Sequence, residues 1–589
     1  MGEARVGAVV PVESGRSATG LGRFRLRGSW RARALPAVLT LLLLALVAVP
    51  IASVVTGSLK PNGLPLGDGW TVRHYVAIWT SSYTYRLLYN TFLFAVGSTV
   101  LAIAIGGILA WLLERTDVPG RRLFRIGILM PMATPSLLLA IGWVLLTSPN
   151  IGIIVHGLKY LIGDAARAVN IYSLGGMIFV QGLANVPLSF LILAPAMRNM
   201  DPSYEEAAFT SGASFLQTLR RVSLPFLTPS ILSLLMLQVI VGMLTFDVPA
   251  VIGLPGNVPV MSAEIFNMMN PTAGLPEYGK TAALNSSLFV VLGIALAVYF
   301  RSTRQADRFS TIGGKGYRAT RFKIGRWRGL AIGFVAGYFT LAVVLPFLAL
   351  VWVSVTPYFA GFQLNLIPRL TLKSYVGIME NPRIWQGAWN SVLIAASASF
   401  GAILIALLVS WTVVRSRVRW VRLLDVLAMI PMGIPHLMMG VALIFIFFTF
   451  KAIPIYGTIW IIALGHLVVY MPEACRMMQV AILQVHKELE EAATVSGAAL
   501  WQNLWRIVTP LVRPMILGIF LWVFVHSLRE FSIAVMLRSG KNEVLSTMLF
   551  SYWDNGRPET AAAIAVMMML FLGVLVAIGN SRRFQGSEN

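Results

Sequence analysis

The segment Gly274–Thr281 has the spacing of a phosphate-binding loop, G-x-x-x-x-G-K-[ST]. In such a loop backbone N–H groups cradle phosphates and the lysine contacts them, so the pattern alone would suggest nucleotide hydrolysis. A loop of this kind follows a buried strand and opens a soluble helix. Here the segment precedes a long apolar stretch. We therefore interpret the match as a coincidence.

A few ionisable residues stand inside or beside long apolar stretches, where charge is costly and often functional. The main candidates are Asp247, His436, Arg529 and Glu530, and His466 and Glu473 lie in similar settings. One interpretation is that these side chains line a path for a solute. The other is that they form ion pairs or extend toward the membrane surface. The sequence leaves both open.

Patterns typical of enzymes and metal sites are missing from the sequence. It contains no Ser/His/Asp spacing, no paired-carboxylate motif and no H-E-x-x-H motif. The single cysteine, Cys475, excludes disulfide frameworks and multi-cysteine metal sites. Methionine clusters at 438–439 and 567–569 would suit copper(I) rather than iron(III), and we interpret them as flexible apolar packing. We predict no catalytic residue, no metal site and no resident cofactor in this chain.

The composition indicates whether the chain lies in water or in a membrane. Of 589 residues, 57% are hydrophobic and 12% are charged, and the mean hydropathy is +0.75. Soluble globular proteins are about 45–50% apolar and about 25% charged, and disordered chains have low hydrophobicity. The sequence therefore predicts an all-α polytopic membrane protein. We assign the net charge of +23 to the flanks of membrane spans, which meet anionic lipid, and predict no nucleic-acid binding.

Twelve apolar stretches are long enough, at about 20 residues, to cross a bilayer as helices. They lie near 35–57, 88–113, 123–147, 171–197, 230–252 and 281–300 in the first half, and near 330–355, 389–413, 424–450, 456–480, 515–537 and 560–579 in the second. Prolines such as Pro131, Pro135, Pro431 and Pro435 fall inside spans. Membrane packing tolerates them because neighbouring helices satisfy the freed backbone groups.

Lysine and arginine residues predict the orientation. With the N-terminus in the cytoplasm, the inner segments hold 33 of the 47 basic residues and the outer loops hold 13. This asymmetry follows the positive-inside rule. We expect a multi-pass protein of the inner (plasma) membrane with cytoplasmic tails at 1–34 and 580–589. The long basic tail before the first span favours an uncleaved anchor over a signal peptide.

The two halves of the chain repeat one another. Met130-Pro131-Met132 recurs 300 residues later as Ile430-Pro431-Met432, and Glu205 and Gly212 recur 285 residues later as Glu490 and Gly497. Six spans per half is an even number, so both halves enter the membrane the same way and the repeat is parallel. We predict six-helix domains at 35–300 and 330–579, joined by a cytoplasmic linker at 301–329, with the solute path between them.

The repeat also bears on the phosphate-loop match. Its counterpart in the second half, Gly556–Thr560, lacks the lysine. The predicted topology places Gly274–Thr281 outside the cell, away from ATP. Both points favour coincidence.

The strongest repeated segments are two loops on the predicted cytoplasmic side. The first reads Glu205-Glu206-Ala207-Ala208-Phe209-Thr210-Ser211-Gly212, then nine residues, then Val222-Ser223-Leu224-Pro225; the second reads Glu490-Glu491-Ala492-Ala493-Thr494-Val495-Ser496-Gly497, then nine residues, then Ile507-Val508-Thr509-Pro510. Each predicts two short helices separated by a break. Asp201-Pro202 offers a cap, with Ser203 and Glu206 as an alternative capping box, and Gly212 permits the ending turn. The alanines give a smooth surface that a soluble partner could approach, once per half.

These loops resemble the signature of permeases in binding-protein-dependent ABC importers, E-A-A, three residues, G, nine residues, I-x-L-P. The first copy has Val222 in place of isoleucine and the second has Thr509 in place of leucine, but both keep the spacing. The resemblance implies the type I ABC importer permease fold. It also implies that the loops are helices that dock on ATPase subunits, with the contact marked by Glu205, Glu206, Ala207, Ala208, Gly212, Glu490, Glu491, Ala492, Ala493 and Gly497.

The resemblance further implies ATP-driven solute import. The fused two-half chain is most similar to ferric-iron permeases; thiamine, polyamine and aminoethylphosphonate permeases are related alternatives. Two cytoplasmic ATP-binding subunits would use the ATP. The outer loops, at most about 30 residues long, are shorter than a domain of roughly 50, so an extracytoplasmic binding protein would capture the solute. The competing hypothesis is an ion-coupled secondary transporter, which needs ion-binding groups at mid-membrane but no duplicated docking loops.

Overall fold

The computed structural model describes residues 30–271, 273–306, 322–359, 361, 363–416, 419–450 and 454–584. In these residues the chain is built of α-helices with short 3-10 and π segments, and its one β contact is an isolated bridge between Thr116 and Phe322. The all-α prediction is confirmed. Residues 1–29 of the predicted tail 1–34, the end of the C-terminal tail and the glycine-rich middle of the linker lie outside the described residues.

Within that part of the chain, nine continuous helices are long and apolar enough to cross a membrane, and three bent helix pairs could each form one more span. The continuous spans of the first repeat are Ala34–Ser58 (α1 Trp30–Leu43, η1 Leu44–Ala48, α2 Val49–Ser58), Ser82–Arg115 (α4), Leu174–Asn199 (α8), Leu216–Leu244 (α10 Phe215–Thr218, η4 Leu219–Ser223, α11 Leu224–Leu244) and Tyr278–Val298 (in α13, Tyr278–Ala306). Those of the second are Gly325–Val355 (η7 Gly325–Trp327, α14 Arg328–Phe339, η8 Thr340–Val344, α15 Leu345–Val355), Pro382–Arg415 (α17), Ile459–Gln484 (α20) and Pro558–Leu575 (in α27, Pro558–Phe584). The chain is a polytopic membrane protein, with up to twelve spans among the described residues.

The third span of each repeat is sharply bent. Arg121–Met132 (α5 Arg121–Leu129, η2 Met130–Ala133) meets Ser136–Thr147 (α6) at 95°, and Arg422–Gly433 (α18 Arg422–Met429, η11 Ile430–Gly433) meets His436–Thr449 (α19) at 108°. Pro135 and Pro435 stand at the breaks in an extended conformation. Proline lacks the N–H that would continue the helix and disfavours helical backbone before it. The prolines therefore lie inside the bent pairs, at the points where the helix direction changes.

The fifth spans end earlier than predicted. In the first repeat α11 ends at Leu244, and a break leads to η5 (Pro249–Gly253) and α12 (Met261–Met269). In the second repeat α24 (Arg513–Arg529) is followed by α25 (Ser532–Met536) and α26 (Leu545–Asp554), and α24 meets the preceding Leu500–Leu511 segment at 75°. The predicted spans 230–252 and 515–537 therefore run past the helix ends, because apolar content continues into short elements.

Each repeat has a tight core, and its first span packs on the third span of the other repeat as well as on its own sixth span. The cores are formed by α4 with α8 and α11, and by α17 with α20 and α24. Small residues allow close approach: a Cβ on Gly106 of α4 would lie 2.5 Å from the Cβ of Ser189 on α8. The first spans pack reciprocally, α1 and α2 against α18 and α19, and α14 and α15 against α5 and α6. The two repeats are thereby interlocked.

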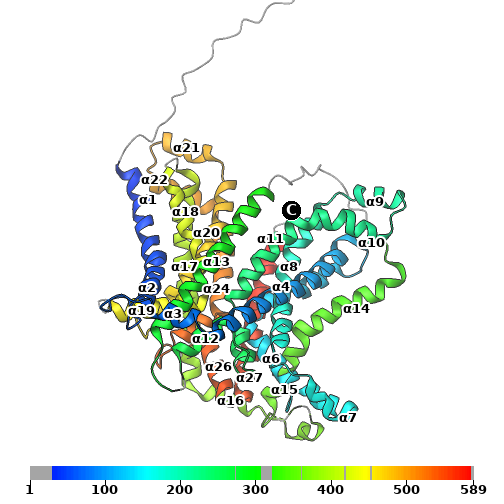
Figure 1. Ribbon diagram of the computed structural model, residues 1–589. Coiled ribbons are helices and arrows are strands. Elements are labelled where there is room, and N and C mark those ends of the chain that lie inside the picture. Colours follow the sequence, from blue (N-terminus) through cyan, green and yellow to red (C-terminus); the bar gives the residue numbers. More distant parts are fainter. Residues whose placement is uncertain are drawn as a thin grey trace, which may run out of the picture.

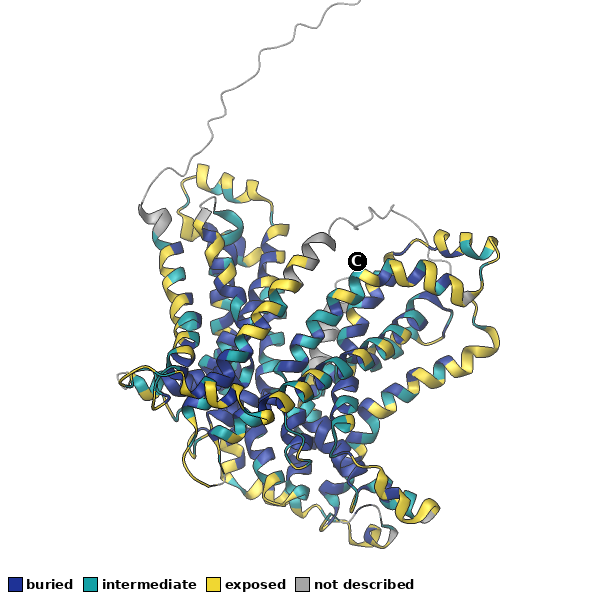
Figure 2. Cartoon of the chain, viewed as in Figure 1, coloured by how far each residue is buried: buried dark blue, intermediate teal, exposed yellow. Residues whose placement is uncertain are grey.

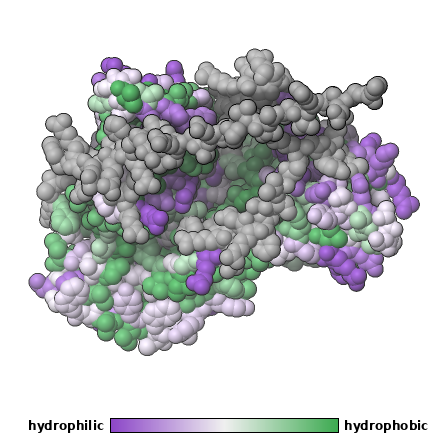
Figure 3. Space-filling model, turned by 90° about the horizontal axis from the view of Figure 1, so that it is seen from above, coloured by the Kyte–Doolittle hydropathy of each residue, from purple (hydrophilic) through white to green (hydrophobic). Residues whose placement is uncertain are grey.

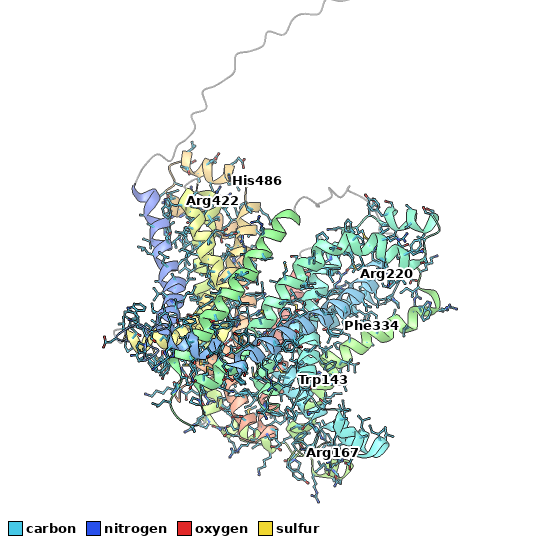
Figure 4. All side chains as sticks on the ribbon, viewed as in Figure 1. Trp143, Arg167, Arg220, Phe334, Arg422 and His486 are labelled. Atoms are coloured by element: carbon cyan, nitrogen blue, oxygen red, sulfur yellow. The ribbon has the colours of Figure 1, made fainter. Side chains whose placement is uncertain are left out.

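The two predicted docking helices, α9 (Ser203–Thr210) and α21 (Lys487–Val495), lie at the same end of the molecule (Figure 1). Arg220 and His486, which neighbour them in sequence, mark that end in the side-chain view, whereas Arg167 lies at the opposite end (Figure 4). The helical repeats therefore run in the same direction, which agrees with the predicted parallel repeat. We call this end the docking face.

Candidate coupling helices and the interface between the repeats

The first glutamate of each docking loop is an anchor. Glu205 forms an ion pair with Arg115, the last residue of α4, and accepts a hydrogen bond of 2.6 Å from the Ser223 hydroxyl. Glu490 pairs with Arg415, the last residue of α17, at 2.7 Å and accepts a bond of 3.1 Å from the Trp411 indole. Both loops are thus tied to the second span of their own repeat.

The second glutamate and the following alanines face outward. Glu206 and Ala207 are exposed and Ala208 is half-buried. Their counterparts repeat the pattern, with Glu491 and Ala492 exposed and Ala493 half-buried. Both helices carry exposed residues along much of their length (Figure 2). Seen onto the docking face, hydrophilic surface is prominent at opposite edges of the molecule (Figure 3).

A glycine in the left-handed conformation ends each docking helix. Gly212 has φ +81° and Gly497 has φ +88°. The N–H of Ala213 donates to the carbonyl of Ala208, and the N–H of Ala498 donates to that of Ala493, at 3.0 and 2.9 Å. This is the Schellman arrangement, which satisfies carbonyls that the helix end leaves free. The predicted role of Gly212 is confirmed.

The start of α9 uses the predicted Asp201 cap rather than the alternative capping box. The helix begins at Ser203, whose N–H donates to the Asp201 carboxylate at 2.9 Å. This bond holds the pKa of Asp201 below its usual value. Ser203 is therefore the first helical residue rather than a cap, and the alternative capping box with Glu206 is not the geometry adopted.

Two equivalent phenylalanines meet where the repeats face each other. Phe246 follows α11 and Phe531 follows α24, and they are 285 residues apart, the offset of the docking loops. Their rings stack with centroids 5.8 Å apart and planes 6° apart, and each is only 1% exposed. Equivalent residues that touch each other lie on the axis relating the repeats. The stack therefore marks the centre of the interface.

Polar side chains beside this stack join the repeats. Asp247 accepts hydrogen bonds from Ser136, the first residue of α6, and from Ser532 of the second repeat at 3.2 Å. The guanidinium of Arg529 donates to the carbonyl of Met132 at the bend of the first repeat. Asp247 and Arg529 thus both cross between repeats at the helix breaks.

Glu530 lies at the centre of a second cluster of polar side chains. Its carboxylate lies 3.1 Å from the Nε2 atom of His466 and 3.4 Å from the Nδ1 atom of His436, and accepts from the N–H of Ile533 at 3.0 Å. The structure therefore gathers all four candidate pathway residues, Asp247, Arg529, Glu530 and His436, around the two bends. Among the described residues no group of three or more His, Cys, Asp or Glu side chains is arranged to hold a metal ion.

Sequence reasoning missed several of these residues. Arg115 and Arg415 share the 300-residue offset and would have been found as a repeated arginine at the end of the second span. Phe246 and Phe531 share the 285-residue offset, but phenylalanine in an apolar stretch gives no other signal. Their contacts connect segments far apart in the chain, so only the fold brings them together.

The phosphate-loop match has a structural explanation. Its last residues open the membrane helix α13, where Lys280 forms an ion pair with Glu277 at 2.9 Å and Thr281 is buried. A Cβ on Gly279 would lie 2.2 Å from His74. Gly279 therefore allows the helix to pack closely on His74. Among the described residues before Gly274, no strand leads into the segment.

Comparison with known families decides the class of protein. A model of the binding-protein-dependent transport system inner membrane component matches residues 102–304 and again residues 400–581. The chain belongs to this family. It is a fused permease subunit of the ABC importer type, which rules out the secondary-transporter hypothesis, and the family is one of transport proteins rather than enzymes.

Two curated relatives resemble the permease over most of its length, and a third resembles part of it. A probable ABC transporter permease protein, y4fN, from Sinorhizobium fredii is 26% identical over 83% of this chain and 86% of its own. The ferric transport system permease protein FbpB from Actinobacillus pleuropneumoniae is 26% identical over 88% of this chain and 74% of its own. A putative 2-aminoethylphosphonate permease, PhnV, from Salmonella paratyphi A is 24% identical but covers 39% of this chain.

A solved structure of a bacterial ABC transporter for alginate import aligns with 48% of the permease and 96% of the matched chain, at 17% identity and a TM-score of 0.38.

Proposed function

We propose that this permease forms the membrane path of an iron(III) importer and is driven by two cytoplasmic ATP-binding subunits that dock on α9 and α21. The observation that carries the proposal is the duplicated docking element. Two helices at one end of the molecule each present an exposed glutamate and alanine, and each is anchored by a glutamate–arginine pair to a second span. This supports two equivalent partners because equivalent surfaces bind equivalent subunits.

Force applied to either docking helix has a direct route into the membrane. Arg115 and Arg415 are the last residues of α4 and α17, which form the cores of the two repeats. In this proposal, ATP binding draws the two motor subunits together. Closure moves the anchored helices, the repeats tilt about the interface, and hydrolysis resets the arrangement. ATP is therefore used by partners and no cofactor is held by this chain.

The Phe246–Phe531 stack is the proposed closure of the path. The two rings occupy the pseudo-symmetry axis, and Asp247 and Arg529 hold the repeats together beside them. Opening the path requires the rings to part and these hydrogen bonds to exchange partners. Asp247, Arg529, Glu530 and His436 are then available to line the path, with the docking face toward the cytoplasm and both termini on that side.

Iron(III) is the proposed solute because a ferric permease matches 88% of the chain, whereas the aminoethylphosphonate relative matches 39% of it. A soluble extracytoplasmic binding protein would deliver the solute to the face opposite the docking helices. This partner follows from the family, whose description specifies dependence on binding proteins.

Uptake into proteoliposomes tests the solute and the energy source together. The permease is reconstituted with its co-encoded ATPase and binding protein, or alone. We expect iron(III) accumulation with ATP and all partners, and none by the permease alone under a proton gradient. Thiamine, a polyamine and 2-aminoethylphosphonate serve as competing solutes. ATP-driven uptake of one of these without iron would overturn the solute, and gradient-driven uptake by the lone chain would overturn the mechanism.

A further inference from the structure

The two docking elements differ in what supports the distal part of the helix. In the second, the amide of Asn503, at the end of α22 (Leu500–Asn503), donates to the Thr494 hydroxyl at 2.9 Å and to the Glu490 carbonyl at 3.3 Å. This internal bracket ties α21 to α22. In the first element, Phe209 takes the place of Thr494 and Thr218 takes the place of Asn503. A phenylalanine ring cannot accept the same hydrogen bond, so α9 requires another support.

That support comes from the end of the linker between the repeats. The ring of Phe209 packs edge-to-face on the ring of Phe322, with centroids 5.5 Å apart and planes 76° apart. This is a preferred arrangement for aromatic pairs. Both residues are half-buried. Phe322 therefore occupies the side of α9 where the Asn503–Thr494 hydrogen bond of the second element has no counterpart.

Phe322 is held in place by the end of α4. Its N–H donates to the carbonyl of Arg115 at 2.9 Å, and its carbonyl accepts from the N–H of Asp117 at 3.1 Å. These two bonds form the isolated parallel bridge of Thr116 with Phe322. Because Arg115 is also the anchor of Glu205, the linker end and the docking helix are fastened to the same turn of backbone.

The Asp117 carboxylate fastens the residues that follow. One oxygen accepts from the N–H of Ile324 at 3.0 Å and the other from the guanidinium of Arg328 at 2.8 Å. The Ile324 bond, with the charge of Arg328, holds the pKa of Asp117 below its usual value. Arg328 is the first residue of α14, which packs on α5 of the first repeat. The linker end thus joins α9, α4 and α14.

We propose that residues 322–328 form a brace that positions the first ATPase docking helix, so that the two docking elements are unequal: α9 depends on the linker and α21 on its own bracket. The effect of the brace on ATPase binding rests on the proposed docking function. The brace itself involves residues of the permease alone. Phe322 is a positioning residue that acts through Phe209.

Amide hydrogen exchange on the purified full-length permease tests the brace without any partner. We expect Phe322→Ala to raise exchange across α9 by several-fold and to leave α21 unchanged. The matched variant Asn503→Ala should raise exchange across α21 and leave α9 unchanged. Phe322→Tyr keeps the ring and should retain the parent pattern. Equal effects of Phe322→Ala on both helices, or none on α9, would overturn the brace.

A photo-crosslinker tests the consequence for docking. It is attached through Ala207→Cys or Ala492→Cys, with the ATPase present; the native Cys475 is buried. We expect Phe322→Ala to lower crosslinking from position 207 several-fold relative to position 492. Absence of crosslinking from both positions in the parent would overturn docking, whereas the exchange result would still decide the brace. An unchanged ratio between the positions would overturn the unequal dependence.

Discussion

Adjacent glutamates in each docking loop have different surroundings. Glu205 is 3% exposed and its partner Arg115 is 1% exposed, whereas Glu206 faces outward. In the second copy Glu490 and Arg415 retain 12% and 13% exposure. The sequence showed two repeated glutamate pairs but could not divide their roles, because each arginine lies 75 or more residues from its glutamate. The fold buries the first glutamate of each pair against an arginine. It leaves the second glutamate exposed and available to a partner.

Removal of the anchors should affect the two copies unequally. Glu205→Ala leaves the Arg115 guanidinium buried without its counter-charge, and breaking a buried pair in this way costs about 3–5 kcal/mol. Glu490→Ala should cost less, because Arg415 is more exposed and keeps two carbonyl acceptors, Ile482 and Val485, at 3.2 and 2.8 Å. Arg115 keeps one, the carbonyl of Met200 at 3.2 Å. Thermal unfolding of the purified variants measures the difference. A larger loss of stability for Glu490→Ala would contradict this account of the anchors.

At the scale of elements, local signals predicted the docking helices well and the membrane spans less well. Glycine after a short alanine-containing helix is a local stop signal, and the structure shows the expected turn at Gly212 and Gly497. Pro135 and Pro435 were recognised in the sequence, but their effect depended on context. Proline inside an apolar stretch is compatible with a continuous span or with a break. The neighbouring helices determine which one forms.

The terminal turn of α9 gives a prediction at this scale. Gly212→Ala should destabilise the helix end by about 1–2 kcal/mol, because an L-residue is strained in the left-handed conformation. A Cβ at Gly212 would meet nothing within 4 Å. The loss of stability therefore comes from backbone strain and not from a steric clash. Amide exchange over residues 205–213 should rise. The control is Gly333→Ala inside α14, where a Cβ also meets nothing; that change should be neutral or stabilising. Slower exchange in Gly212→Ala would refute the role of the turn.

At the scale of the whole molecule, the repeat determines where the path closes. Offsets of 300 and 285 residues predicted two parallel halves with the path between them, and the stacked equivalents Phe246 and Phe531 lie on that interface. The packing of each first span on the third span of the other repeat was not predictable from spacing. It depends on which surfaces α1 and α14 cover, and both have apolar residues around most of their circumference.

The closure predicts a leak when both rings are removed. Phe246→Ala combined with Phe531→Ala should let proteoliposomes lose a potassium gradient several-fold faster than the parent, because no side chain then fills the axis. Phe266→Ala is the matched control, since its ring lies 5.1 Å from that of Phe246 but belongs to the same repeat. A double variant as tight as the parent would show that the path closes elsewhere.

The central claim is that α9 and α21 receive the ATPase subunits, and the double variant Glu206→Ala with Glu491→Ala tests it most directly. ATPase association is measured by co-purification and ATP-driven uptake in proteoliposomes, with Glu380→Ala, an exposed acid on α16 (Lys373–Glu380) away from the docking helices, as the control. We predict normal membrane insertion but association weakened by about tenfold or more, equivalent to ~1.4 kcal/mol, with uptake lost. Association and uptake equal to those of the parent and of Glu380→Ala would contradict the claim.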